Sequence, residues 1–169
     1  MTKTRQIINI NELEYQEWSH GNRFEGRMGE IAGEIGAKKL GYNLTIVPAG
    51  KRAFPFHSHH VNEEMFYVLE GSGEIRIGAE TCPIKAGDFI NCPAGGPETG
   101  HQIVNTMDDG ELKYLAVSTS LYPEICQYPD TGKKLIRHYW PAGQDNGEET
   151  LRIILKEGEG QVDYWVGEE

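Results

Sequence analysis

The segment that decides the fold is residues 50–71, which reads GKRAFPFHSHHVNEEMFYVLEG. It places His57 and His59 two positions apart and puts Glu64 at the head of an apolar run. On a β-strand, residues i and i+2 point to one face, whereas a helix would place them on different faces. We therefore expect residues 51–56 to lead into the histidine pair as a strand, and a hairpin to bring Glu64 opposite that pair.

Apolar and alternating runs, separated by turn residues, continue on both sides of this segment. We expect strands at residues 42–47, 65–69, 74–77, 89–92, 102–105 and 112–118. Short strands at this spacing are typical of an all-β sandwich or barrel. No linker divides the chain, so we expect a single domain.

The residue types in the decisive segment point to metal chemistry. Two neutral imidazoles and one carboxylate suit a divalent transition metal. A further ligand must come from elsewhere, and His101 is the candidate because it opens the strand that follows the loop at residues 93–100. The predicted metal ligands are therefore His57, His59, Glu64 and His101. Four protein ligands leave one or two positions open on a five- or six-coordinate ion, as a catalytic metal requires.

The spacing in this segment resembles the first motif of the cupin superfamily. Gly50 is followed after six residues by His57-x-His59, then after four residues by Glu64, and after six more by Gly71. The gap after Gly50 is one residue longer than is usual in the family. Glu63 competes with Glu64 as the ligand, but the six-residue gap to Gly71 favours Glu64.

A second stretch, residues 87–105, resembles the second cupin motif. It contains Gly87, then Pro93-x-Gly95, then His101 and Asn105. Five residues separate Gly95 from His101 where the family has two, so the loop before His101 is longer here. We expect this loop to influence substrate specificity. Together with residues 114–117 and 128–130, the stretch is similar to a group of uncharacterised bacterial single-domain cupins.

The resemblance covers about residues 40–119 and implies a double-stranded β-helix, the jelly-roll barrel of cupins. Residues 1–39 are then an N-terminal extension that packs on the barrel, and residues 120–169 are a C-terminal extension. Residues 11–18 fit either a short helix or an irregular arm. Cupins of this kind are often dimers, so we expect a homodimer.

Strand alternation extends the map of the site. Phe66 and Val68 share the parity of Glu64, while Ile103 and Asn105 share that of His101, so all should point into the barrel. We expect Val68 to be a core residue. The residues predicted to line a pocket beside the metal are Phe66, Ile103 and Glu63. His60 should point away from the face of its neighbour His59.

Charge and cysteine content limit the partners and the compartment. The 169-residue chain has a formal net charge of −10 and no basic patch, so we expect neither nucleic acid nor a membrane as a partner. The odd set of Cys82, Cys92 and Cys126 fits no zinc or redox spacing, which favours free thiols. No long apolar run opens the chain, and we expect a cytoplasmic protein.

The resemblance implies a metal-dependent enzyme of the oxygenase, decarboxylase or isomerase type that acts on a small polar metabolite. One alternative is a non-catalytic cupin that binds or senses a small molecule, and another is a structural metal with no open position. The donor set accepts manganese, iron, zinc, nickel or cobalt and does not choose among them. No catalytic residue can be named from the sequence.

Overall fold

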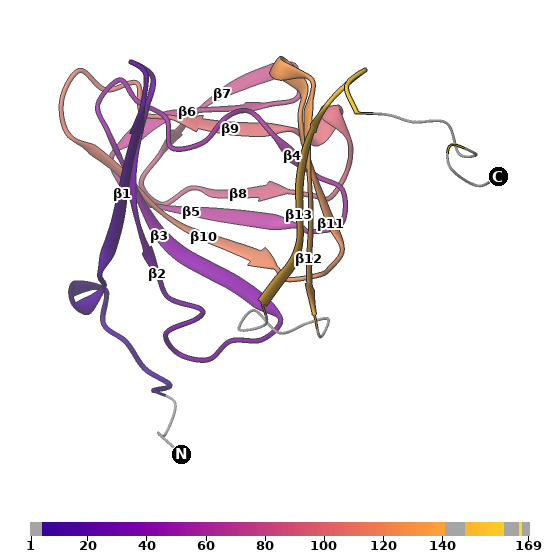
Figure 1. The fold of residues 1–169 in the computed structure, drawn as a ribbon. Helices are drawn as coiled ribbons and strands as arrows, with labels where there is room; N and C mark the ends of the chain where they lie inside the picture. Colours follow the sequence, from indigo (N-terminus) through magenta and orange to yellow (C-terminus); the bar gives the residue numbers. More distant parts are fainter. Residues whose placement is uncertain (1–4, 141–147, 161–165, 167–169) are drawn as a thin grey trace.

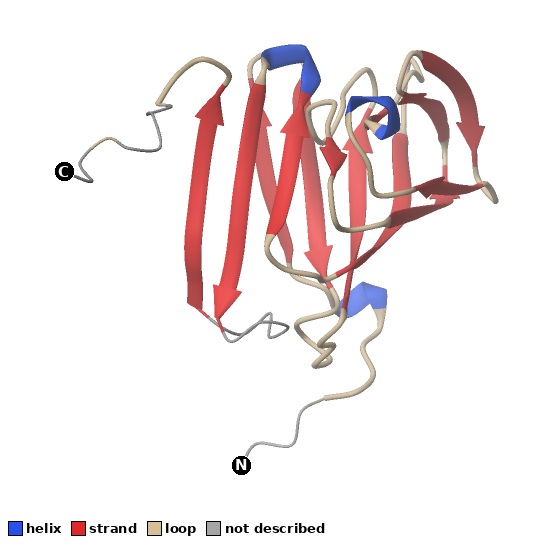
Figure 2. Cartoon of the chain, turned by 90° about the vertical axis from the view of Figure 1, so that its right-hand side faces the viewer, coloured by secondary structure: helices blue, strands red, loops and turns tan. Residues whose placement is uncertain are grey.

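The computed structural model describes residues 5–140, 148–160 and 166. These residues form antiparallel β-strands, with short 3-10 helices between some of them, as Figures 1 and 2 show. The 3-10 helices are η1 (Ile10–Glu12), η2 (Pro97–Thr99) and η3 (Pro129–Thr131). The predicted all-β class and the jelly-roll barrel of double-stranded β-helix type are therefore confirmed.

The largest sheet has six strands in the order β1-β2-β3-β10-β5-β8. Their bounds are Tyr15–His20 (β1), Phe24–Glu30 (β2), Leu40–Pro48 (β3), Glu111–Thr119 (β10), Glu64–Glu70 (β5) and Phe89–Cys92 (β8). The strands predicted at residues 42–47, 65–69, 89–92 and 112–118 are confirmed as β3, β5, β8 and β10. The first two strands lie in the predicted N-terminal extension and lengthen this sheet along the edge of β3.

Two smaller sheets complete the molecule. One has the order β7-β6-β9, and the other has the order β13-β12-β11-β4. Their bounds are Glu80–Lys85 (β7), Ser72–Ile77 (β6), His101–Val104 (β9), Glu148–Lys156 (β13), Lys133–Trp140 (β12), Glu124–Tyr128 (β11) and Ser58–His59 (β4). Figure 1 shows β6, β7 and β9 as a layer above β5, β8 and β10, with β11, β12 and β13 along one side.

The core lies between these layers, where alternate residues of each strand point inward. Phe66 and Val68 of β5 are buried, as is Ile103 of β9, so their predicted inward direction is confirmed. Asn105 is fully buried and donates its side-chain amide to the carbonyl oxygens of Val47 and Gly110, at 2.9 and 3.1 Å. It thereby gives hydrogen-bond partners to a carbonyl oxygen of β3 and to one in the turn directly before β10.

Gly71 marks the sharp turn from β5 into β6. Its φ of +83° lies in the left-handed region, and a Cβ there would come within 2.5 Å of the Glu111 carbonyl oxygen. Only glycine fits such a position without strain. The glycine that ends the decisive segment is therefore required by the backbone.

The segment before the histidine pair is not the strand that its sequence predicts. Residues 51–56 contain only isolated bridges at Arg52, and β4 is limited to Ser58–His59. Pro55 has no N–H to offer to a neighbouring strand. Because β4 pairs with β11 and not with β5, the predicted hairpin is also wrong.

The two extensions contain more strand than the sequence predicts. Residues 11–18 are neither a helix nor an irregular arm, since η1 ends at Glu12 and β1 begins at Tyr15. The strands β11, β12 and β13 of the C-terminal extension were also not expected, and neither was β7 within the barrel. In the part of the chain that the structure describes, no helix is long and apolar enough to cross a membrane.

Candidate metal centre

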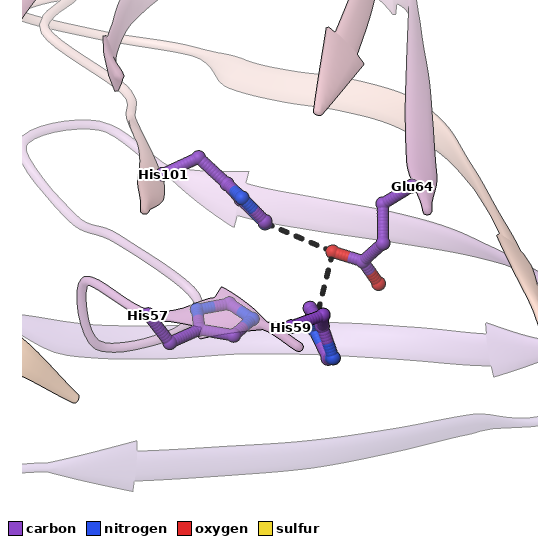
Figure 3. A group of neighbouring side chains, drawn as sticks. All are labelled: His57, His59, Glu64 and His101. Carbon is purple, nitrogen blue, oxygen red and sulfur yellow. Dashed lines mark hydrogen bonds and ion pairs between the residues drawn. The ribbon is translucent and has the colours of Figure 1, made fainter. Parts of the chain in front are cut away.

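The four predicted ligands lie together at one end of the barrel. Each of His57, His59, Glu64 and His101 offers an atom, and these atoms all lie within 4.8 Å of one another. Figure 3 shows the four side chains turned toward a common point. We call them the four-residue cluster.

The backbone that brings these side chains together differs from the predicted hairpin. The backbones of His57 and His101 form two hydrogen bonds: the His57 N–H donates to the His101 carbonyl oxygen at 3.2 Å, and the His101 N–H donates to the His57 carbonyl oxygen at 2.8 Å. His59 lies in β4, opposite Cys126 of β11, and Glu64 begins β5, opposite Cys92 of β8. The cluster is therefore assembled by pairings distant in sequence.

Neighbouring groups orient the imidazole rings. Nδ1 of His57 donates to the Pro55 carbonyl oxygen at 2.8 Å, which leaves Nε2 as the atom with a lone pair. Nδ1 of His59 lies 3.3 Å from the Cys126 sulfur. Contacts of this kind fix the tautomer of a metal-binding histidine. The carbonyl contact fixes His57 in the tautomer whose Nε2 carries the lone pair, and Nε2 of His59 lies 3.5 Å from Oε2 of Glu64.

The carboxylate of Glu64 joins the rings electrostatically. Its Oε2 lies 2.9 Å from Nε2 of His101 and 3.5 Å from Nε2 of His59. Burial raises the pKa of Glu64, but the hydrogen bond from His101 and the nearby histidine charges outweigh it and lower that pKa to about 2. Glu64 is thus ionised, as a metal ligand must be.

The histidines differ strongly in basicity. Burial, together with the neighbouring rings of His101 and His59, lowers the pKa of His57 to about 4. Burial also lowers the pKa of His101, but the Cys92 thiol and the Glu64 carboxylate outweigh it and raise that pKa to about 10. Without a metal, His101 and Glu64 therefore form an ion pair at neutral pH.

The cluster also has the chemistry that a transition metal requires. Nε2 of His59 is buried and has no hydrogen-bond partner, which costs roughly 1–3 kcal/mol for a buried polar atom. A cation at the point where the donors converge would give this nitrogen a partner. Three imidazoles and one carboxylate are a donor set for manganese, iron, cobalt, nickel or zinc. The residues present therefore fit such an ion.

A cavity of about 230 Å³ adjoins the cluster. Phe66 and Ile103 line it, in agreement with the sequence analysis, whereas Glu63 is exposed and lies outside it. The backbone of Glu63 instead pairs with Thr119. The predicted pocket role of Glu63 is therefore not supported.

The C-terminal strands supply a wall of this cavity that the sequence analysis missed. Cys126 and Tyr128 come from β11, and Leu135 and Arg137 come from β12. The Tyr128 ring stacks on His57 with centroids 6.0 Å apart. None of the described residues that line the cavity belongs to the loop at residues 93–100, so the expectation that this loop influences specificity is not supported.

Glu124 is a further residue that the sequence pattern did not indicate. It is buried, and its carboxylate accepts the backbone N–H groups of His60 and Asn62 at 3.1 and 3.0 Å, as well as the Asn62 side-chain amide. These bonds fix the turn between His59 and Glu64. Glu124, His59 and Cys126 also form a compact group, but the oxygens of Glu124 are already occupied by N–H donors. The group therefore supports His59 and does not suit a second ion.

The remaining histidine and cysteine predictions agree with the structure. His60 is exposed, and its Nε2 lies 3.1 Å from Oε1 of Gln127, away from the cluster. All three cysteines are free thiols, with Cys82 exposed and Cys92 and Cys126 buried.

Part of the chain that carries this site matches a known family model. Residues 43–118 match the model of the Cupin domain family. The uncharacterized protein MJ1618 of Methanocaldococcus jannaschii is 38% identical over 77 residues, which cover 46% of this chain and 58% of that protein. Quercetin 2,3-dioxygenase of Bacillus subtilis is 34% identical over 59 residues, which cover 34% of this chain and 18% of the enzyme. The chain thus spans little more than half of the first relative and less than a fifth of the second.

Solved structures extend the likeness beyond the matched domain. A putative sugar phosphate isomerase of Acidithiobacillus ferrooxidans superposes with a TM-score of 0.75 at 22% identity, covering 94% of this chain and 97% of the other. At that identity the likeness shows the fold alone. A predicted oxalate decarboxylase of Thermotoga maritima gives a TM-score of 0.57 at 25% identity, covering 67% and 97% of the two chains.

Proposed function

We propose that this chain, a member of the cupin superfamily, uses the four-residue cluster to hold a divalent transition metal and acts as a metal-dependent enzyme on a small polar metabolite. The observation that carries the proposal is the convergence of four donor atoms within 4.8 Å beside a cavity of about 230 Å³. That volume is below the roughly 300–1,000 Å³ of pockets for drug-sized ligands, which favours a small molecule.

The protein's own residues would prepare the site. A bound ion would act as a Lewis acid that polarises substrate oxygen atoms. The Pro55 carbonyl holds His57 in the tautomer that offers Nε2, and the Cys126 thiol contacts Nδ1 of His59. Phe66 and Ile103 give the cavity an apolar side next to the polar cluster.

The reaction type within this proposal is of the oxygenase, decarboxylase or isomerase class. A curated relative is a quercetin 2,3-dioxygenase, and a structural neighbour is a predicted oxalate decarboxylase. Each shares only part of its length or sequence with this chain, so these names support the range of reactions without selecting one. The metal is drawn from manganese, iron, zinc, nickel and cobalt.

A non-catalytic binding or sensing role is the alternative, and one observation favours it. The cavity offers few groups that could exchange a proton at neutral pH apart from the cluster. Burial raises the pKa of Tyr114 and Tyr128, and it raises the pKa of Cys126 to about 12. A binding cupin needs no such group, whereas an enzyme would have to rely on its metal and substrate for proton transfer.

We also propose that residues 40–119 form the barrel proper, that residues 1–39 and 120–169 are extensions of a single domain, and that the protein is a cytoplasmic homodimer. The pairings of β2 with β3 and of β11 with β4 support the single domain, because each joins an extension to the barrel by backbone bonds. Size-exclusion chromatography with light scattering tests the dimer.

Elemental analysis of protein purified without metal-affinity chromatography tests the metal. We expect about one transition-metal ion per chain in the wild type and in His60→Ala, and much less in His59→Ala. His60 is the matched control because it neighbours His59 but turns away from the cluster. Equal metal contents in the two variants would contradict the assignment.

Turnover by the loaded protein then separates the two functions. Iron- and manganese-loaded protein should consume dioxygen, release carbon dioxide or isomerise a substrate from a panel of small polar metabolites. A protein that binds metal and a small molecule without any turnover would support the alternative.

A further inference from the structure

We propose that the cavity beside the four-residue cluster selects small anionic molecules, and that Arg137 binds their carboxylate or phosphate group. This inference rests on the proposed function, because it places the other end of the same molecule at the metal. It assigns a ligand class and a specificity-determining residue to the cavity.

The position of Arg137 is the first observation. Its half-buried side chain reaches from β12 into the cavity that the four-residue cluster also lines. Among the described residues around that cavity, only Arg137 carries a permanent positive charge. A guanidinium is planar and presents paired N–H donors, which match the oxygens of a carboxylate or phosphate.

The side chain of Arg137 is also held in place. Its guanidinium donates a hydrogen bond to the Tyr139 hydroxyl, and its Cζ lies 5.3 Å from the centre of the Tyr139 ring. A positioned arginine loses less side-chain entropy when it binds a ligand. Arg137 borders an adjoining hollow as well, beside Tyr42 and Tyr139, so it lies where the cavity meets a second depression.

Other cations gather on the same face of this sheet. Arg152 of β13 pairs in register with Arg137, and Lys133 pairs with Tyr128. The Lys133 ammonium lies 5.5 Å from the centre of the Tyr128 ring, which itself stacks on His57. In a chain of net charge −10, three cations on one face beside the metal pocket make a local field that attracts anions.

Two carboxylates among the described residues near this face have roles of their own. Glu124 is opposite Arg137 in the strand register, but its oxygens accept N–H groups from residues 60–62. Glu64 belongs to the four-residue cluster. The small volume of the cavity, about 230 Å³, then limits the ligand to a compact molecule with an oxygen donor at one end and an anionic group at the other.

Binding of three probes tests the proposal: malonate, inorganic phosphate, and malonamide as the uncharged counterpart of malonate. We expect calorimetry on the metal-loaded wild type to detect malonate or phosphate and not malonamide. Arg137→Gln should weaken anion binding by about tenfold or more, because a charged hydrogen-bond pair is lost. Arg152→Gln is the matched control, since Arg152 is exposed and does not line the cavity, and it should weaken binding by less than about threefold.

The variants must be folded for the comparison to hold, which circular dichroism and a thermal melt establish. If Arg137→Gln does not fold, Arg137→Lys replaces it, because it keeps the charge but loses the planar fork. We then expect binding to weaken severalfold. The tighter of the two anions, malonate or phosphate, identifies the group that the site prefers.

The outcomes separate this inference from the proposed function. Full metal content with equal anion binding by wild type and Arg137→Gln overturns the inference and leaves the metal proposal standing. Equal binding of malonate and malonamide, or no binding of either anion, also overturns it. If the protein takes up no metal but still binds anions in a way that depends on Arg137, the anion site is supported and the metal proposal is contradicted.

Discussion

Replacement of Glu124 by glutamine should destabilise the protein strongly, although Glu124 is not among the predicted metal ligands. Its Oε1 accepts the N–H groups of His60 and Ile125 at 3.1 and 2.9 Å, with Val61 at 3.4 Å. Its Oε2 accepts the N–H of Asn62 at 3.0 Å and the side-chain amide of the same residue. If Oε2 becomes the amide nitrogen, the buried N–H and side-chain amide of Asn62 lose this acceptor. If Oε1 does, the half-buried N–H groups of Val61 and Ile125 lose it, whereas the N–H of His60 keeps the Ile125 carbonyl oxygen.

The size of the effect follows from these bonds. A buried donor left without an acceptor costs about 1–3 kcal/mol, so two donors cost roughly 2–6 kcal/mol. Replacing the buried carboxylate by a neutral amide offsets part of this loss in stability, because no charge then has to be removed from water on folding. We therefore expect Glu124→Gln to lower the free energy of unfolding by about 2–4 kcal/mol. For a chain of this size, that lowers the melting temperature by roughly 4–16 °C.

Denaturant unfolding of wild type and variant in the presence of a chelator measures this effect without a contribution from metal binding. Glu63→Gln is the matched control, since Glu63 is exposed and lies close to Glu64 in the chain. It should change stability by less than about 0.5 kcal/mol. If the two variants unfold at the same denaturant concentration, the carboxylate of Glu124 does not hold the turn as we infer.

Two further predictions concern titratable groups. Alkylation at about pH 8 should modify the exposed Cys82 at least about tenfold faster than Cys126, because burial raises the pKa of Cys126 to about 12. Mass spectrometry of the folded protein measures both rates, and equal rates would contradict the burial of Cys126. In the metal-free protein, the ion pair of Glu64 and His101 should stabilise the fold most between about pH 4.5 and 6.5. The pKa of Glu64 is lowered to about 2, so the contribution of Glu64 to stability falls as the pH drops below this window. The pKa of His101 is raised to about 10, so the contribution of His101 falls as the pH rises above the window. Unfolding of wild type and Glu64→Gln from about pH 3 to about pH 9 tests that window, and a stability difference that stays constant below and above the window would contradict it.

The barrel strands could be predicted because their signals are local. Alternation gave the inward direction of Phe66, Val68 and Ile103, and turn residues bounded the strands that carry them. The four predicted ligands could likewise be named from their spacing, and the structure brings them together. Their assignment as ligands remains a prediction until metal is measured.

The pairing of the histidine segment could not be predicted, because its partner is distant in sequence. β4 is only two residues long and is held by β11, more than sixty positions later. A local pattern favours a hairpin between neighbours, and here a long-range pairing prevails over it. Glu124 was missed for the same reason, since a single acidic residue carries no sign of the N–H groups that it meets only in the folded chain.

These long-range pairings divide the site between two parts of the chain. The barrel provides all four predicted ligands, whereas the C-terminal strands β11 and β12 provide Cys126 next to His59, Tyr128 against His57, and Arg137 in the lining of the cavity. The long loop before His101 does not line the cavity: its Gly95 N–H donates to the His59 carbonyl oxygen at 2.8 Å, and its Pro97 and Glu98 border a separate hollow beside Arg76. Two cupins with the same ligand motif can therefore differ in their ligands through residues 124–137 alone. Exchange of that segment should alter which molecule binds, whereas shortening of the loop at residues 93–100 should alter it much less.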